Sequence, residues 1–186
     1  MTGNAEKLFH PLRDQAGASS SGSAGGAENS MDQFLNAFSS AARETLLKAD
    51  EEARRLGHVV VATEHLLLGA IFTAPDLFEE MNYDAGKIVT AVEFIAGREN
   101  RAPTSGPIGL SPRAVRVLRL ASDEYAARTG NTTPNEEVDQ YDLLIAILRE
   151  GEGLGAGVLE SLGASLDKVR SATQRIRERK RTPKKA

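Results

Sequence analysis

Two stretches of the chain are apolar at nearly every position. One runs from Thr63 to Ile71 and the other from Gln140 to Leu148, and each begins with a short polar opening. Such continuous apolar character predicts a helix that is buried on most of its surface. In the first stretch, the Thr63 hydroxyl is suited to cap the unpaired amides of the opening turn, and Glu64 is suited to the positive helix end.

A longer amphipathic helix is predicted before each of these stretches. In the first half, small and apolar residues recur at three- and four-residue steps between charged ones, at Ala42, Leu46, Ala49, Ala53 and Leu56. Ser39 or Ser40 is suited to cap this helix, and Gly57 is suited to end it. In the second half, Ser111-Pro112 places a capping residue before a proline in the first turn, which is typical of a helix start.

The two halves of the chain match each other in three blocks. Blocks that begin at Ser39, Thr63 and Phe78 match blocks that begin at Ser111, Gln140 and Leu159, at offsets of 72, 77 and 81 residues. Because the order is kept and the offset grows only at loops, the pattern indicates a tandem repeat. No convincing alternation of apolar and polar residues predicts a strand. We therefore expect an all-α fold, a tandem repeat of two four-helix units with about eight helices.

The predicted domain organisation follows from these blocks and from the composition between them. We expect a disordered low-complexity arm at 1–34, rich in Ser, Gly and Ala, because such a segment cannot bury a core. The double-repeat domain is predicted at 35–178, with repeat one at 38–97, a linker at 98–110 and repeat two at 111–178. A basic tail is predicted at 179–186.

Composition limits the class of protein. The 186 residues have room for one domain plus tails, and 40% of them are hydrophobic. Cysteine is absent, which excludes disulfides and thiolate metal sites and fits a reducing compartment. No apolar run approaches the roughly 18–20 residues that span a bilayer, and the N-terminus lacks a signal-peptide core. A cytoplasmic location is the expectation.

Charge is distributed unevenly along the chain. Nine Lys and Arg residues and one acid lie from Lys168 to Ala186, which leaves 14 bases and 25 acids in the rest. The basic end is suited to bind nucleic-acid phosphates, although it lacks aromatic residues for base stacking. It can equally be a solvated helix end or dock on an acidic partner surface. A nucleic-acid-associated helical protein that acts through this tail is the alternative function.

The sequence resembles the Clp N-terminal domain, the Clp R double repeat at the front of Clp-family AAA+ unfoldases. The resemblance covers roughly 38–178 and is closest to the ClpC type. It rests on the segments 49–58 (ADEEARRLGH), 63–69 (TEHLLLG), 148–153 (LREGEG) and 158–163 (VLESLG). In that family the domain binds substrates and adaptors, and stand-alone versions act as accessory proteins of the Clp machine.

No phosphate-binding loop of the type Gly-x-x-x-x-Gly-Lys-[Ser/Thr] occurs in the chain, and too little of it remains for an ATPase module. The expectation is a stand-alone domain without AAA+ modules, which is not an enzyme and requires no cofactor. It would bind Clp unfoldase components, substrates or adaptors and so modulate proteolysis. We expect no catalytic residue, since nothing marks an activated nucleophile.

The resemblance also points to ligand-binding residues. In ClpC-type domains that recognise phosphorylated arginine, the glutamate of the Thr-Glu-His stretch binds together with a hydroxyl residue at the start of the first helix. These positions are Glu64 and Ser39 here. A carboxylate accepts a two-pronged bond from guanidinium, and a phosphate favours a positive helix end. The alternative is that Glu64 only tunes the helix dipole and Ser39 only caps.

The second copy of this pattern differs. Ser111 keeps the hydroxyl, but Tyr141 replaces the glutamate and Asp142 replaces the histidine. We therefore expect a phosphoarginine-like ligand to bind far more strongly at the first copy. His65 has no histidine one helical turn away, so we expect a polar contact at the edge of the core and no metal site.

Overall fold

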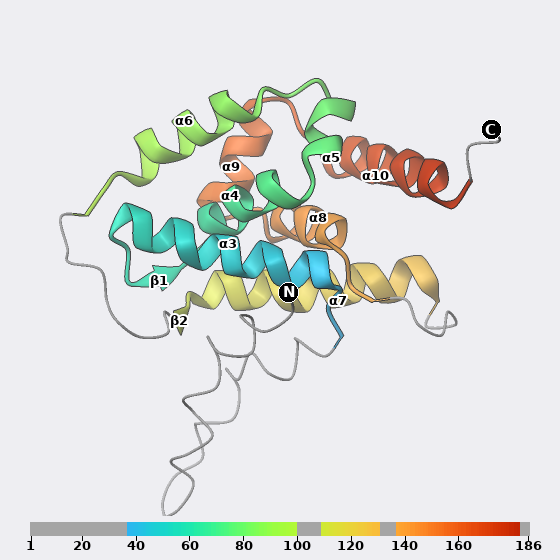
Figure 1. Ribbon diagram of the computed structural model, residues 1–186, viewed down its shortest axis with the longest axis horizontal. Coiled ribbons are helices and arrows are strands. Elements are labelled where there is room, and N and C mark those ends of the chain that lie inside the picture. Colours follow the sequence, from blue (N-terminus) through green and yellow to red (C-terminus); the bar gives the residue numbers. More distant parts are fainter. Residues whose placement is uncertain (1–36, 100–108, 131–136, 183–186) are drawn as a thin grey trace, which may run out of the picture.

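A computed structural model of the chain describes residues 37–99, 109–130 and 137–182 (Figure 1). The predicted arm at 1–34 and most of the predicted linker lie outside these ranges, as does the stretch 183–186 of the predicted basic tail. None of the helices in the described ranges combines the length and the apolar character that a bilayer span requires.

Each repeat contributes four helices to the described part of the chain, which confirms the predicted all-α class. Repeat one contains α3 (Ser40–Leu56), α4 (Thr63–Thr73), α5 (Pro75–Glu80) and α6 (Ala85–Ala96). Repeat two contains α7 (Pro112–Thr129), α8 (Gln140–Glu150), α9 (Leu154–Ser161) and α10 (Leu166–Arg181). Two short strands, β1 (Val60–Val61) and β2 (Gly109–Leu110), pair in parallel between the repeats.

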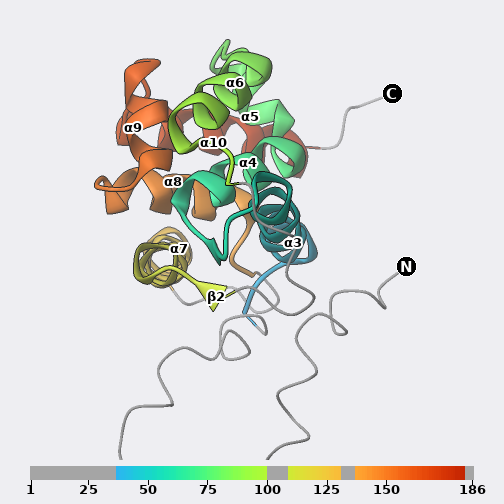
Figure 2. The ribbon, with the colours of Figure 1, turned by 90° about the vertical axis from the view of Figure 1, so that its left-hand side faces the viewer.

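The helices lie in three tiers (Figures 1 and 2). α3 and α7 form one outer tier, α4 and α8 lie in the middle, and α5, α6, α9 and α10 form the opposite tier. α4 packs on α3 of its own repeat and on α8 and α9 of the other. α8 packs on α7, α9 and α10 and reaches α3 and α4 in repeat one.

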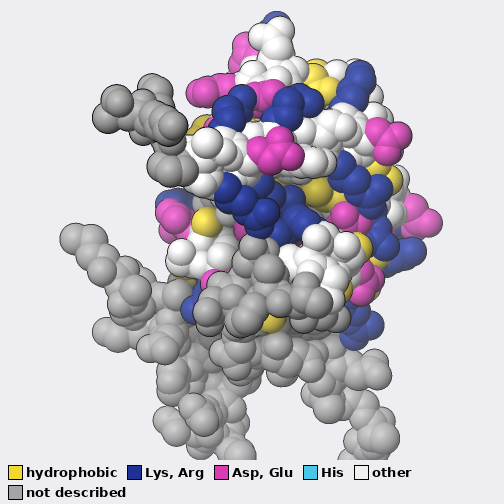
Figure 3. All heavy atoms as spheres, turned by 90° about the vertical axis from the view of Figure 1, so that its right-hand side faces the viewer, with side chains coloured by type: hydrophobic (Ala, Val, Ile, Leu, Met, Phe, Trp, Pro, Cys, Tyr) yellow, Lys and Arg dark blue, Asp and Glu magenta, His cyan; other side chains and the backbone are white. Residues whose placement is uncertain are grey.

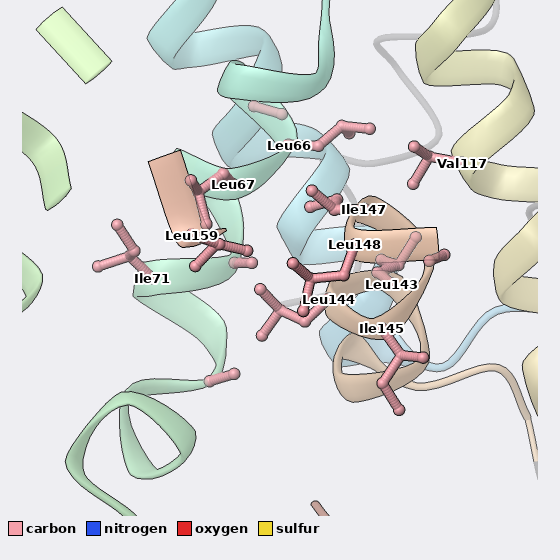
Figure 4. Close-up of a cluster of buried hydrophobic side chains, with 14 of the residues drawn as sticks. Leu66, Leu67, Ile71, Val117, Leu143, Leu144, Ile145, Ile147, Leu148 and Leu159 are labelled. Atoms are coloured by element: carbon pink, nitrogen blue, oxygen red, sulfur yellow. The ribbon is translucent and has the colours of Figure 1, made fainter. Parts of the chain in front are cut away.

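The two central helices are the ones that the apolar stretches predicted. Leu67 of α4 and Leu144 of α8 are 0% and 2% exposed. Both lie in a single cluster of buried side chains that draws on both repeats, together with Leu66, Ile147 and Leu159 (Figure 4). The repeats therefore share one hydrophobic core.

Local signals predicted the ends of the outer helices correctly. The Ser39 hydroxyl accepts a hydrogen bond from the Ala42 N–H at 3.2 Å, and Ser111 does the same for Ala114 at 3.1 Å. Gly57 ends α3 in the left-handed region, with φ of +81°. These caps depend on residues within one turn, so sequence alone is enough to place them.

The prediction that Thr63 caps α4 is wrong. Ala62 occupies the N-cap position and its side chain makes no cap hydrogen bond. The Thr63 hydroxyl instead accepts a hydrogen bond from the Gly155 N–H of α9, at 3.3 Å. The start of α9 packs against the start of α4, and this tertiary contact redirects the hydroxyl away from its own helix.

Glycine makes this contact between repeats close. A Cβ added to Gly155 would lie 2.6 Å from the Thr63 carbonyl oxygen, and one added to Gly153 would lie 2.2 Å from the Thr63 hydroxyl. Within repeat one, a Cβ on Gly69 would lie 2.3 Å from the Thr45 carbonyl oxygen of α3. Larger residues at these positions would push the helices apart.

The basic end of the chain continues α10, and its cations contact acids of the body. Arg175 and Arg179 both contact Glu80 of α5, at 2.7 and 2.8 Å. Hydrogen bonds from these two guanidinium groups hold the pKa of Glu80 below its usual range. Lys180 contacts Asp76, which is also in α5, at 2.9 Å. The last helix of repeat two is thereby tied to the third helix of repeat one.

The close approach of α9 to α4 can be tested at two glycines of α9. Gly155→Ala should lower the free energy of unfolding by about 1–3 kcal/mol, because the Thr63 carbonyl is backbone and cannot turn aside. Gly157→Ala is the matched control, since a Cβ there meets nothing within 4 Å. It should stabilise the protein by about 0.5–1 kcal/mol through its higher helix propensity. Urea denaturation measures both, and equal stabilities would contradict the contact.

Candidate functional site

The starts of α4 and α7 meet at one end of the molecule, and we call this place the Glu64 opening. It comprises Thr63 and Glu64 at the start of α4 and Ser111, the N-cap of α7. β1 lies just before α4, β2 lies just before Ser111, and the two strands pair. The Ser111 N–H donates to the Val61 carbonyl at 2.9 Å. A residue of repeat two therefore lies beside the start of the central helix of repeat one.

The Glu64 opening contains backbone N–H donors and a carboxylate that form few hydrogen bonds with the described part of the chain. Within the described part of the chain, nothing bonds to the backbone N–H groups of Thr63 and Glu64. The Glu64 carboxylate accepts one long hydrogen bond, 3.5 Å, from the Thr63 hydroxyl. Helix amides attract an anion and a carboxylate attracts a cation, so this arrangement can hold a ligand that carries both.

Two histidines join the end of α3 to the start of α4 at this opening. His58 Nδ1 lies 2.8 Å from His65 Nε2. His65 Nδ1 accepts a hydrogen bond from the Ala62 N–H at 2.9 Å, so neutral His65 carries its proton on Nε2 and donates it to His58. Burial lowers the pKa of His65 to about 4, and the nearby His58 acts in the same direction. His65 is therefore neutral near pH 7.

The sequence did not predict the contact between the two histidines, because they lie seven residues apart and not one turn apart on a single helix. The ligand atoms of His58, Glu64 and His65 lie within 4.8 Å of one another, a grouping that can in principle hold a metal. A metal needs a free lone pair on each ligating nitrogen. His65 already accepts at Nδ1 and donates at Nε2, so its hydrogen bonds fit a neutral histidine pair instead. The sequence signal for the pair was the short helix-to-helix connection, which places adjacent helix ends side by side.

Ser39 lies far from the Glu64 opening. The Thr45 hydroxyl near the start of α3 lies 2.6 Å from that of Thr73 at the end of α4, so the two helices are antiparallel. α3 has 17 residues and is about 25 Å long at 1.5 Å per residue. The expected pairing of Ser39 with Glu64 is therefore not formed. Ser111 takes that place, because the first helix of each repeat begins beside the central helix of the other repeat.

Ser39 belongs to the equivalent place at the start of α8, which we call the Tyr141 opening. It comprises Ser39 with Asp139, Tyr141 and Asp142. The Ser39 N–H donates to the Val138 carbonyl at 2.9 Å. Here α8 is capped by a side chain, since the Asp139 carboxylate accepts from the N–H groups of Tyr141 and Asp142, both at 2.9 Å.

Guanidinium groups of the chain itself occupy the Tyr141 opening. Arg177 of α10 contacts Asp139 at 2.7 Å and Asp142 at 2.8 Å, and Arg128 of α7 contacts Asp142 at 3.0 Å. Burial raises the pKa of Asp142 and the Asp139 charge adds to this, whereas Arg128 and Arg177 oppose it. The carboxylates of this opening are thus already paired, unlike Glu64.

The chain matches the family described as the Clp repeat (R) N-terminal domain over residues 37–133. It is 37% identical over 137 residues to "Negative regulator of genetic competence ClpC/MecB" from Bacillus subtilis (strain 168), a match that covers 72% of this chain and 16% of the relative. It is 41% identical over 143 residues to "Chaperone protein ClpC2, chloroplastic" from Oryza sativa subsp. japonica, covering 75% of this chain and 15% of the relative. The chain thus spans only about a sixth of the length of these relatives.

Two solved structures have a similar fold. The N-terminal domain of the chaperone ClpD from Arabidopsis thaliana matches with a TM-score of 0.58 at 22% identity, over 76% of this chain and 96% of that chain. The Hsp104 N-terminal domain from Candida albicans matches with a TM-score of 0.60 at 20% identity, over 75% of this chain and 91% of that chain. At these identities the likeness concerns the fold alone.

The neutral state of His65 should make stability depend on pH. An unfolded histidine has a pKa of about 6.5, above the value of about 4 in the folded protein. The unfolded chain therefore binds more protons, and stability is lost as the pH falls from about 6.5 toward 4. Between about pH 7.5 and pH 5, the wild type should lose about 1–2 kcal/mol more than His65→Gln, whose amide oxygen can accept the Ala62 N–H without titrating. Urea denaturation at both pH values measures this, and equal losses would contradict a buried neutral His65.

Proposed function

The chain belongs to the Clp repeat (R) N-terminal domain family, and we propose that it acts as a protein-binding module of a Clp protease system. In this proposal it catalyses no reaction itself. It binds substrates, adaptors or the unfoldase, and this binding changes the rate of proteolysis. The observation that carries the proposal is the Glu64 opening, where an uncapped helix start and an available carboxylate meet. A cytoplasmic location belongs to the same proposal.

The relatives support a role in handling other proteins. One is named a chaperone protein and another a negative regulator of genetic competence, and the match covers 15% and 16% of their lengths, respectively. A role of this chain in the processes that those whole proteins carry out is therefore part of the proposal. The portion that they share with it is the domain that carries the Glu64 opening.

The ligand proposed for the Glu64 opening is a phosphoarginine-like group on a protein. The Glu64 carboxylate would accept a two-pronged bond from the guanidinium part. The amides of Thr63 and Glu64, at the positive end of α4, would bind the phosphoryl part. The Ser111 hydroxyl accepts the Ala114 N–H and keeps its own proton for a phosphoryl oxygen.

The Tyr141 opening is not proposed as a second site of similar strength. Its Asp139 and Asp142 carboxylates contact Arg177 and Arg128, so a ligand would have to displace those guanidinium groups. Its helix amides are also bonded to Asp139. We therefore expect the ligand to bind at the Glu64 opening with much higher affinity than at the Tyr141 opening.

The alternative, nucleic-acid binding through the basic end, finds less support in the described residues. Arg175, Arg179 and Lys180 are held against acids of α5. A phosphate backbone would have to compete with those carboxylates for each cation.

The role in proteolysis can be tested in a reconstituted reaction. Purified protein is added to the Clp unfoldase and peptidase of the same cell, and the degradation rate of a fluorescent substrate is followed. The proposal expects the rate to change when the protein is equimolar with the unfoldase, and the two to co-elute on a sizing column. An unchanged rate at a large excess, without co-elution, would refute it.

Binding at the Glu64 opening should depend on Glu64 and Ser111 but not on Ser39. Calorimetric titration with phosphoarginine should show that Glu64→Gln weakens binding about ten- to a hundredfold, the usual loss for a charge-assisted partner. Because the Glu64 carboxylate accepts only one long hydrogen bond among the described residues, the melting temperature of the Glu64→Gln variant should stay close to that of the wild type.

Two serine variants provide the matched control. Ser39→Ala and Ser111→Ala each remove a helix cap, so both should cost about 1 kcal/mol of stability. Only Ser111→Ala should also weaken phosphoarginine binding. No heat of binding with wild type, or equal losses from the two serine variants, would contradict the proposed ligand and its position.

A further inference from the structure

A cleft of about 580 Å³ lies between α7, α8 and α10, at the opposite end of α7 from the Glu64 opening. Its volume falls in the range of about 300–1,000 Å³ that is usual for ligand sites. Arginines from two helices line it: Arg128 of α7, and Arg170, Arg177 and Arg181 of α10. Figure 3 faces the end of the molecule where α7 and α10 finish, and Lys and Arg side chains gather on it.

Two of these arginines keep donors that no described residue uses. Arg170 donates to Glu124 through Nε and Nη2, at 3.2 and 2.6 Å. Arg177 donates to Asp139 through the same two nitrogens, at 3.0 and 2.7 Å, and to Asp142 through Nη2. Among the described residues, neither Nη1 group has a hydrogen-bond partner. Each guanidinium is therefore fixed along one edge, and its remaining N–H groups stay available to a ligand.

The acids that line the cleft do not cancel its positive charge. Among the described residues, four arginines line it together with three acids, Glu124, Asp142 and Glu178. Glu124 is also held by Arg149, which contacts it at 2.9 Å. The cleft therefore favours an anionic ligand, with oriented guanidinium donors that suit carboxylates and phosphates.

The spacing of the donors indicates what kind of anion fits. Arg170 and Arg177 lie seven residues apart on one face of α10, about 10 Å along its axis. A single phosphate or carboxylate is too small to reach both. An extended peptide in the polyproline II conformation has three residues per turn and rises about 3.1 Å per residue, so it places carboxylates three residues apart on the same face at close to that distance. Of the residues that the structure describes, none that lines the cleft is aromatic, so none can stack on a base. We propose that this cleft binds an acidic peptide segment that carries two carboxylates about 10 Å apart.

The test is fluorescence anisotropy with a labelled peptide that has two glutamates three residues apart, against a control peptide with glutamine at both positions. Wild type should bind the acidic peptide and not the control. Arg170→Gln should weaken binding about ten- to a hundredfold. Arg175→Gln is the matched control, because it removes the same charge from the same helix. Arg175 contacts Glu80 of α5 and does not line the cleft, so this variant should change the affinity less than about threefold.

Thermal melts accompany each variant, so that a folding defect is recognised. If Arg170→Gln is unstable, Arg170→Lys keeps a cation beside Glu124 and still removes the forked donors, and it should also lose most of the affinity. Equal losses for Arg170→Gln and Arg175→Gln, or equal binding of the two peptides, would overturn the proposal. Tighter binding of a single-stranded RNA than of the peptide, lost in Arg170→Gln, would overturn the assignment to a peptide.

This proposal is independent of the Glu64 opening. Glu64→Gln should bind the acidic peptide as the wild type does, because Glu64 does not line the cleft. Failure of phosphoarginine binding would therefore leave the acidic-peptide result intact, and the reverse also holds.

Discussion

The fold depends on the burial of two short apolar helices that neither repeat covers alone. α4 is packed by α3 of its own repeat and by α8 and α9 of the other. The contact of Thr63 with Gly155 brings backbone against backbone and leaves no room for a side chain. Because each central helix is completed by the other repeat, its start lies beside a helix start from that repeat. The Glu64 opening and the Tyr141 opening are therefore each formed by residues of both repeats.

The two openings have the same arrangement of helix starts but differ in capping and in charge pairing. At the start of α8, Asp139 caps the helix and both Asp139 and Asp142 are neutralised by arginines of the chain. At the start of α4, the corresponding positions are Ala62, which cannot cap, and His65, which is kept neutral by burial. The two openings are thus similar in arrangement, but arginines of the chain pair with the carboxylates of the Tyr141 opening, whereas Glu64 accepts only one long hydrogen bond among the described residues.

Local sequence patterns were enough to predict the helices, since periodicity and caps such as those at Ser39, Gly57 and Ser111 act within one or two turns. They were not enough to predict which residues meet. The role of Thr63, the contact of His58 with His65, and the separation of Ser39 from Glu64 all depend on how helices pack. The tandem repeat suggested that residues of one repeat form one pocket, whereas the packing between repeats places Ser111 beside the start of α4.

The central claim is that one ligand site is built from the start of α4 in repeat one and the start of α7 in repeat two. Two-dimensional ¹H–¹⁵N NMR spectra recorded during titration with phosphoarginine test it most directly. The account predicts that the amide signals of Thr63, Glu64 and Ser111 shift together with one affinity, while those of Ser39 and Asp139 stay in place. Shifts centred on Ser39 and Asp139, or shifts of Glu64 without Ser111, would contradict it.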